Sequence, residues 1–324
     1  MSNLEIRARR YRRPFTRPLR TALGEWRVRE GIVLRVADPE TNRVGFGEIA
    51  PLPDNQDSRL PSTDVVASRS FLSSPADPCV SFAISSALAR LEEAEISPSP
   101  VRTAALLGLG PGTASEISSR RAEGHRTFKL KVGLADPESE WGFLQAVTGS
   151  LKAGEQLRLD PNRSWDPAAW EFWKPRLGEM DGWIEFVEEP FAGPEARERM
   201  IAEGAIAPVP LALDESLVAG SLEFWLKHAW PGYFVVKPSL TGNPANWLDP
   251  LGNRANRVVL SSAFETGIGI SAVLRLAQAF PGTDHGLGTQ SYFEDNWGVP
   301  RSGAVITALS TKQEEQLWNR LPAD

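Results

Sequence analysis

Short apolar runs recur through the middle of the chain, and each of them ends on a polar or charged residue. Their last residues lie 23 to 29 positions apart, a spacing that fits one strand plus one helix. Asp136-Pro137 and Asp166-Pro167 each place a capping Asp before a proline at the first position of a helix. The pattern predicts strands alternating with helices around a parallel sheet. The six runs are 126–131, 156–160, 184–188, 210–214, 233–237 and 257–262.

Two more segments extend this series at its ends. Val101–Leu106 can supply a first strand, and the stretch near Leu287-Gly288 can supply a last one. The sequence therefore predicts an α/β fold, a (β/α) barrel with seven or eight strands. In such barrels the functional side chains lie at the C-terminal ends of the strands.

The first hundred residues have a different pattern. Residues 4–13, 31–37 and 43–50 predict three strands of an antiparallel meander, and 17–26 is rich in turn formers. Residues 53–78 predict loop plus a short helix, 82–91 a helix, and 95–100 a linker. We therefore expect a small α+β region that ends near residue 98.

Composition excludes several classes of protein. The chain has 324 residues, 41% hydrophobic and 23% charged, and it has no apolar run of the ~18 residues that a membrane helix needs. The net charge of −6 argues against nonspecific nucleic-acid binding. With one cysteine, Cys79, and three scattered histidines, neither a disulfide framework nor a His-rich zinc site is expected.

Seven arginines lie within the first twenty residues. A transit peptide should be a Ser-rich amphipathic helix, whereas residues 4–9 alternate with period two and Pro14 and Pro18 break helices. A nucleic-acid-binding arm is the second alternative. The pattern favours an exposed basic strand paired with acidic partners. In the absence of a signal-peptide pattern we expect a cytoplasmic protein.

Three carboxylates, Asp160, Glu188 and Asp214, each end a different predicted strand. In a barrel those ends converge, and three buried carboxylates close together repel one another and lose hydration. They need a cation, and oxygen ligands favour Mg²⁺, Mn²⁺ or Ca²⁺ over zinc. A single strand-end acid often caps the following helix, but three at regular spacing indicate a metal site.

Lysines complete the candidate site. Lys129 and Lys131 lie two residues apart on one strand and so share a face, and Lys237 ends a later strand. An exposed strand edge is the alternative explanation for the first pair. A lysine beside other cations gives up its proton more readily, and a neutral lysine is a general base. A divalent metal flanked by lysines suits abstraction of a proton next to a carboxylate.

The order Lys-x-Lys, Asp-x-Asn, Glu-Glu-Pro, Asp-Glu-Ser and Lys-Pro resembles the enolase superfamily, muconate-lactonizing enzyme subgroup. The resemblance covers essentially the whole chain. It implies an α+β capping domain at 1–98, a modified (β/α)₇β TIM barrel at 99–300, and a C-terminal segment, 301–324, that returns to the cap. The superfamily's known use of a lysine base with Mg²⁺ supports this reading of the site.

The resemblance also implies roles for individual residues. Asp160, Glu188 and Asp214 would bind Mg²⁺, with Mn²⁺ as an alternative. Lys131 would take the α-proton and return it to a departing hydroxyl, and Lys237 would stabilise the developing charge from the opposite face. Lys129 and Asn162 would lie beside the metal and substrate. The expected substrate-arm contacts are Ser261, Ser262 and the loop from Leu19 to Gly24.

Within the subgroup the chain is most similar to members that carry out a syn dehydration in menaquinone or phylloquinone biosynthesis. The alternative is racemisation of N-acylamino acids or epimerisation of dipeptides, which uses the same lysine pair and metal site. The intact lysine and carboxylate set argues against a non-catalytic barrel. A small-molecule substrate is expected, without nucleic acid or membrane partners; the oligomeric state stays open.

Overall fold

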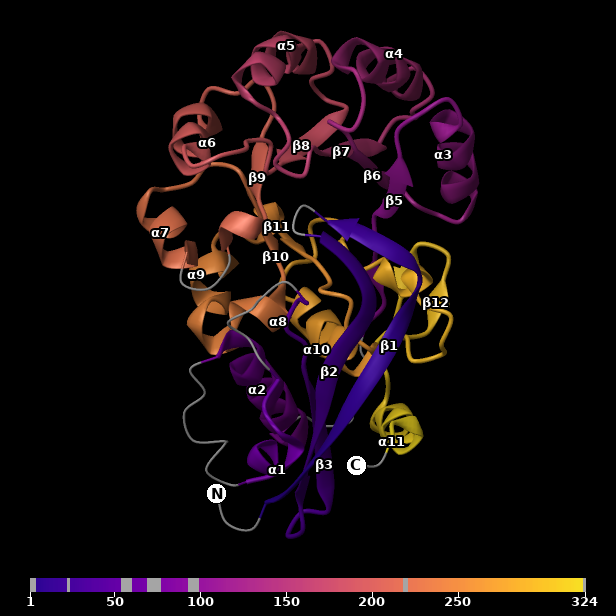
Figure 1. Ribbon diagram of the computed structural model, residues 1–324, viewed down its shortest axis with the longest axis vertical. Coiled ribbons are helices and arrows are strands. Elements are labelled where there is room, and N and C mark those ends of the chain that lie inside the picture. The colour runs from indigo at the N-terminus through magenta and orange to yellow at the C-terminus, as the bar shows by residue number, and fades with distance from the viewer. Residues whose placement is uncertain are drawn as a thin grey trace.

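A computed structural model gives the architecture of the protein (Figure 1). Figure 1 shows a barrel surrounded by helices at one end and a sheet-and-helix cap at the other, with the long strands of the cap reaching toward the barrel. The residues that the structure describes are 4–21, 24–53, 60–68, 77–92, 99–217 and 221–322.

The cap is built on a three-stranded antiparallel sheet in the order β1-β2-β3. The predicted meander is confirmed, but the expectation of a turn-rich region at 17–26 was wrong, because β1 continues to Thr21 and β2 begins at Gly24. Pro14 and Pro18 are accommodated because β1 is an edge strand and its register shifts between Pro14 and Leu19. The strands are β1 (Glu5–Thr21), β2 (Gly24–Asp38) and β3 (Arg43–Ile49).

Helix α2 (Pro78–Glu92) packs on this sheet. A Cβ on Gly47 would lie 1.9 Å from the carbonyl oxygen of Ala83, so only glycine allows this close approach. The short helix α1 (Thr63–Val66) lies within the segment predicted as loop plus short helix. Most of the predicted linker lies outside the described residues.

The barrel sheet has the parallel order β11-β10-β9-β8-β7-β6-β5, and every predicted run contributes one strand. Residues 285 and 286 close it, because they form parallel bridges to Thr103 on one side and Ser261 on the other. The eighth strand position is thus the segment predicted near Leu287, and the (β/α)₇β barrel is confirmed. The strands are β5 (Ala105–Gly108), β6 (Thr127–Lys131), β7 (Gln156–Asp160), β8 (Ile184–Glu188), β9 (Leu211–Leu213), β10 (Tyr233–Val236) and β11 (Val258–Leu260).

Helices follow the barrel strands and cover their outer side (Figure 1). Asp136 and Asp166 cap α4 and α5 through their side chains, and a proline opens each helix, as predicted. The helices are α3 (Thr113–Ala122), α4 (Pro137–Thr148), α5 (Pro167–Gly178), α6 (Ala196–Gly204), α7 (Ser221–Lys227), α8 (Pro238–Thr241), α9 (Leu248–Gly252) and α10 (Gly267–Ala277).

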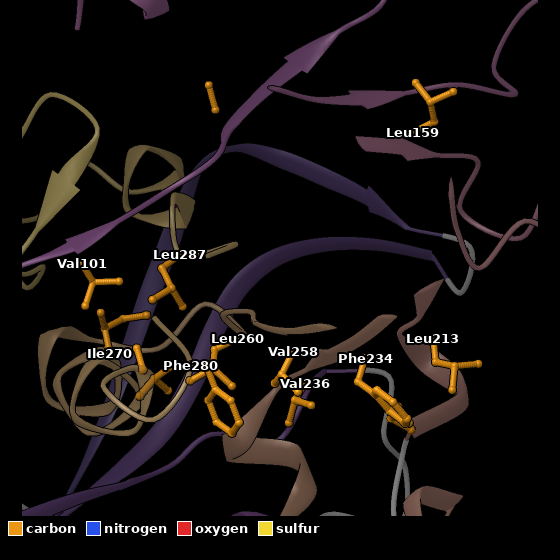
Figure 2. Close-up of a cluster of buried hydrophobic side chains, with 14 of the residues drawn as sticks. Val101, Leu159, Leu213, Phe234, Val236, Val258, Leu260, Ile270, Phe280 and Leu287 are labelled. Carbon is orange, nitrogen blue, oxygen red and sulfur yellow. The ribbon is translucent and has the colours of Figure 1, made fainter. Parts of the chain in front are cut away.

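The main core lies between the barrel strands and the helices around them. Figure 2 shows part of it, with Phe234 and Val236 from β10 beside Val258 and Leu260 from β11. Ile270 of α10 lies in the same cluster, which fixes the end of the barrel where the sheet closes. The tryptophans at 165, 170 and 173 are buried, in agreement with their predicted core role.

The end of the chain lies against both parts of the molecule. A second small sheet pairs β12 (Arg301–Ser302), β13 (Val305–Ile306) and β4 (Val101–Arg102), and α11 (Thr311–Arg320) follows it. Trp318 of α11 lies 6.3 Å from Phe46 of the cap, measured between ring centroids. No helix among the described residues is long and apolar enough to span a membrane.

Candidate active site

The three predicted carboxylates lie at neighbouring strand ends. Asp160 and Glu188 are the last residues of β7 and β8, and Asp214 directly follows β9. Asp160 is 5% exposed and Glu188 is 2% exposed, so both side chains are withdrawn from solvent. The parallel sheet therefore places three acids side by side along one wall of the barrel mouth.

Lysines neutralise this acidic wall. The Nζ atom of Lys129 lies 2.9 Å from Oδ2 of Asp160 and 2.5 Å from Oε1 of Glu188. Lys237, which follows β10, forms an ion pair with Asp214. Lys131 donates to Oδ1 of Asn162 at 2.8 Å and lies 3.7 Å from Asp160.

The backbone turns sharply just after several of the strand ends that form the candidate site. Asn162, Glu189 and Phe264 have positive φ angles of 52°, 39° and 66°, which non-glycine residues rarely adopt. The turn at Asn162 lets its N–H donate to Asp160 while its side chain reaches Lys131. Glu189 accepts hydrogen bonds from the backbone N–H groups of Asp214 and Ser216 and so fixes the third acid.

The pKa values of the buried acids and lysines are shifted because their charges lie close together. Burial raises the pKa of Glu188 to about 8, and the charges of Asp160 and Asp214 act in the same direction against Lys129. Burial also works to raise the pKa of Asp160, but Lys129 and Lys131 outweigh it and the pKa is lowered. For Lys129 and Lys237, burial works to lower the pKa, yet the neighbouring carboxylates outweigh it and both pKa values are raised.

The donor set fits a hard divalent cation. Among the residues that the structure describes, no three acidic, histidine or cysteine side chains are already gathered as a metal cage, because Lys129 lies between Asp160 and Glu188. All three donors are nevertheless carboxylates, and the charges of Asp160 and Asp214 act to raise the pKa of Glu188. Such oxygen ligands suit Mg²⁺, and a cation shared by all three requires Lys129 to withdraw.

The barrel geometry sets Lys131 and Lys237 opposite each other. Counting the closing segment, β6 and β10 are four positions apart in an eight-membered ring. The carboxylates from β7, β8 and β9 lie on the arc between them. Lys131 and Lys237 therefore stand on opposite sides of the mouth, with the acidic wall along the arc between them.

The predicted substrate-arm residues lie in two places. Ser261 bridges to the closing segment, whereas Ser262 is 3% exposed and its hydroxyl contacts Glu265 and Thr289. Leu19 packs against a cluster formed by Phe15, Trp26 and Phe293, together with Leu52, Phe264 and Tyr292. Gly24 begins β2 with a φ of 138°, and the intervening residues 22 and 23 lie outside the described residues.

Sequence reasoning missed Tyr292 at this mouth. It belongs to the aromatic cluster, and the charge of Lys129 acts on its hydroxyl, whose pKa burial raises. Its position four residues past Gly288, in the stretch predicted as the last strand, carries no local motif. A signal was present only in the aromatic pair Tyr292-Phe293 close to the predicted strand end.

Comparisons with known proteins agree with this fold. Residues 112–229 match the family model described as enolase C-terminal domain-like. A curated o-succinylbenzoate synthase from Thermosynechococcus vestitus is 35% identical over 96% of this chain and 97% of its own length. A dipeptide epimerase from Enterococcus faecalis, solved with Mg and a dipeptide, is 19% identical, with a TM-score of 0.75 over 94% of this chain and 97% of its own, and shares the fold.

A barrel with carboxylates at successive strand ends and lysines on both sides defines an enzyme of the enolase superfamily. The crystal structure of o-succinylbenzoate synthase from Thermosynechococcus elongatus, complexed with Mg in its active site, matches with a TM-score of 0.83 and 31% identity, covering 98% of this chain and all of its own. The chain belongs to the o-succinylbenzoate synthase family. This membership confirms the predicted enzyme class, a carbon–oxygen lyase.

Proposed function

We propose that this protein converts 2-succinyl-6-hydroxy-2,4-cyclohexadiene-1-carboxylate to o-succinylbenzoate by a Mg²⁺-dependent syn dehydration. The observation that carries the proposal is the pair of opposed lysines, Lys131 and Lys237, flanking the acidic wall. Family membership supports this particular reaction, and the product is a precursor in menaquinone or phylloquinone biosynthesis.

Asp160, Glu188 and Asp214 would hold the metal. A bound Mg²⁺ supplies positive charge that stabilises the negative charge developing on the substrate carboxylate. Lys129 can then leave its two acidic partners and face the same carboxylate. Asn162 holds Lys131 through its amide oxygen and orients it toward the mouth.

Lys131 is the proposed base and acid. As a neutral amine it takes the proton from the carbon that bears the carboxylate, and the electron pair is held on that carboxylate as an enediolate until it forms the ring double bond to the neighbouring carbon. The C–O bond to the hydroxyl on the same face then breaks, and Lys131 returns its proton so that water leaves. The ring becomes aromatic, with no oxidant or reductant required. Lys237 contributes its positive charge on the other face.

The alternative is racemisation of an N-acylamino acid or epimerisation of a dipeptide. There both lysines must transfer protons, one on each face, whereas in the syn dehydration Lys237 acts through its charge. Lys237→Arg therefore separates the two reactions. An arginine keeps the positive charge but stays protonated, so it cannot act as a base.

The test follows ultraviolet loss of the cyclohexadiene with Mg²⁺, comparing the native chain with Lys131→Ala, Lys237→Ala and Lys237→Arg. We expect rapid loss in the native chain, a decrease of roughly 10²–10⁴-fold in Lys131→Ala, and partial recovery by Lys237→Arg relative to Lys237→Ala. A folded, Mg²⁺-binding native chain that leaves the diene intact but exchanges the α-proton of N-acylamino acids or dipeptides overturns the synthase proposal in favour of the racemase or epimerase.

A further inference from the structure

Two buried charged side chains of the cap end on a single barrel loop. Arg29 of β2 and Glu48 of β3 are both 0% exposed. The loop covers residues 261–266 and connects β11 to α10. Arg29 and Glu48, named here the cap clamp, hold this loop mainly through its backbone.

Arg29 binds backbone carbonyl oxygens from two parts of the chain. Its Nε donates to the carbonyl of Ala263 at 3.1 Å, and its two terminal nitrogens donate to the carbonyls of Pro51 and Ala50. One guanidinium thus joins the barrel loop to the segment that follows β3. Its planar set of donors makes such simultaneous bonding to several acceptors feasible.

Glu48 binds the first turn of α10. Its carboxylate accepts from the backbone N–H of Thr266 at 3.0 and 3.1 Å and from that of Gly269 at 3.0 Å. Tyr11 of β1 donates its hydroxyl to the same carboxylate at 2.6 Å. A carboxylate at a helix N-terminus is stabilised by the unpaired N–H groups and by the helix dipole.

Gly269 leaves room for this contact because it has no Cβ atom. A Cβ at position 269 would lie 2.9 Å from Oε2 of Glu48 and 2.7 Å from Cβ of Glu265. A side chain there would push the carboxylate away from the turn. The glycine and the acid are therefore complementary across the cap–barrel boundary.

The clamped loop reaches two parts of the candidate active site. Phe264 contacts Trp26 and Tyr292 edge-to-face, with ring centroids 6.1 and 5.5 Å apart. Glu265 accepts from the hydroxyl of Ser239 at 2.5 Å, and Ser239 lies two residues beyond Lys237. A displacement of the loop would therefore move Phe264 within the aromatic cluster. It would also disturb Ser239, which lies close to Lys237 in the chain.

We propose that Arg29 and Glu48 are positioning residues that hold the 261–266 loop against the cap and so place the substrate-binding wall of the barrel mouth. This inference rests on the proposed function for its kinetic consequence, but the clamp itself is testable without the reaction. The cap would then contribute to substrate binding through the barrel loop that it holds.

The experiment compares Glu48→Gln with Glu314→Gln. Glu314 of α11 is also a 0% exposed carboxylate, but it pairs with Arg275 in the last turn of α10, at 2.7 Å, and with Arg90 of α2 rather than with the loop. Gly269→Ala perturbs the clamp from the barrel side and covers the case in which Glu48→Gln fails to fold. Each full-length variant is measured for amide hydrogen exchange and for KM and kcat.

We expect faster exchange confined to the amides of residues 263–269 in Glu48→Gln and Gly269→Ala. We also expect KM to rise about tenfold and kcat to change less than about threefold, because the loop carries Phe264 of the aromatic cluster directly, whereas Lys131 stands on another strand and Lys237 keeps its ion pair with Asp214. Glu314→Gln should leave both constants and this exchange unchanged.

Unchanged loop exchange in both clamp variants overturns the clamp. Faster exchange with KM equal to that of Glu314→Gln overturns the positioning role. If the native chain lacks synthase activity, the proposed function fails, and the exchange data still decide whether the clamp exists.

Discussion

Lys129 is the principal counter-charge of the acidic wall, so replacing it should make stability depend on Mg²⁺. Its Nζ atom lies 2.9 Å from Asp160 and 2.5 Å from Glu188, and these acids are 5% and 2% exposed. In Lys129→Met both acids lose this partner while staying buried. Leaving a buried charge without its partner costs about 3–5 kcal/mol.

The cost converts to a melting temperature. With an unfolding entropy of about 2.1 cal/mol/K per residue, the 324 residues give roughly 0.7 kcal/mol per degree. Lys129→Met should therefore melt about 4 to 7 °C below the native chain in EDTA. In excess Mg²⁺ the difference should shrink, because a cation bound by the acids replaces the missing ammonium.

The assay is thermal melting followed by fluorescence, in EDTA and in excess MgCl₂. Lys174→Met is the matched control, since Lys174 also forms an ion pair, 2.7 Å from Glu203, but its side chain is 30% exposed and lies on α5. Its effect should be below about 1 kcal/mol and independent of Mg²⁺. An equal deficit for Lys129→Met with and without Mg²⁺ would refute the assignment of these acids as the metal site.

Three further predictions concern the frame of the site. Glu140→Gln should lower stability by about 1.5–3 kcal/mol, measured by urea unfolding, because the carboxylate accepts from three successive backbone N–H groups at 133–135. Burial and Arg158 lower the pKa of His285 to about 4, against an ordinary value of 6.5. The unfolded state therefore binds the proton first, and up to about 3 kcal/mol of stability is lost as pH falls from 6.5 to 4. The pH slope of Tm should be shallower in His285→Gln. Gly133→Ala should destabilise the protein by about 1–3 kcal/mol, because φ is 75° and the new Cβ would lie 2.1 Å from Oγ of Ser164. Gly142→Ala should instead stabilise it by about 0.5–1 kcal/mol, because Gly142 lies inside α4 with open space around its Cβ position. Equal melting temperatures for these two variants would contradict the backbone argument.

The barrel and the acidic wall were predictable because their signals are local. A strand-and-helix repeat, two Asp-Pro caps and acids at successive strand ends are all written in short stretches of sequence. The roles of Lys131, Lys237 and the three acids stay predictions that activity and metal binding must test. Their proximity, in contrast, is a direct consequence of parallel strands that end at the same mouth.

Strand lengths in the cap were less predictable. Two prolines four residues apart ordinarily indicate a break, and the sequence from Arg17 to Trp26 predicts a turn-rich region. On an edge strand, however, a proline that lacks an N–H can face outward without removing a sheet hydrogen bond. Whether a strand lies at an edge is a property of the assembled sheet, so the local pattern could not decide it.

The contacts between cap and barrel lay furthest beyond sequence reasoning. Glu48 and Thr266 are partners across 218 residues, and Arg29 and Ala263 across 234. Neither pair has a spacing that a motif could reveal, and a buried arginine is indistinguishable in sequence from its exposed neighbours on the same strand.

The charged part of the candidate site and its aromatic part differ in the same way. The strand ends that carry the acids and lysines belong to the barrel and can be predicted from local sequence, whereas the aromatic cluster at the mouth is assembled from cap and barrel together. A fold shared with a dipeptide epimerase at 19% identity is therefore compatible with a different substrate. Substitutions at the cap–barrel boundary should change which molecule binds before they change whether a proton is transferred.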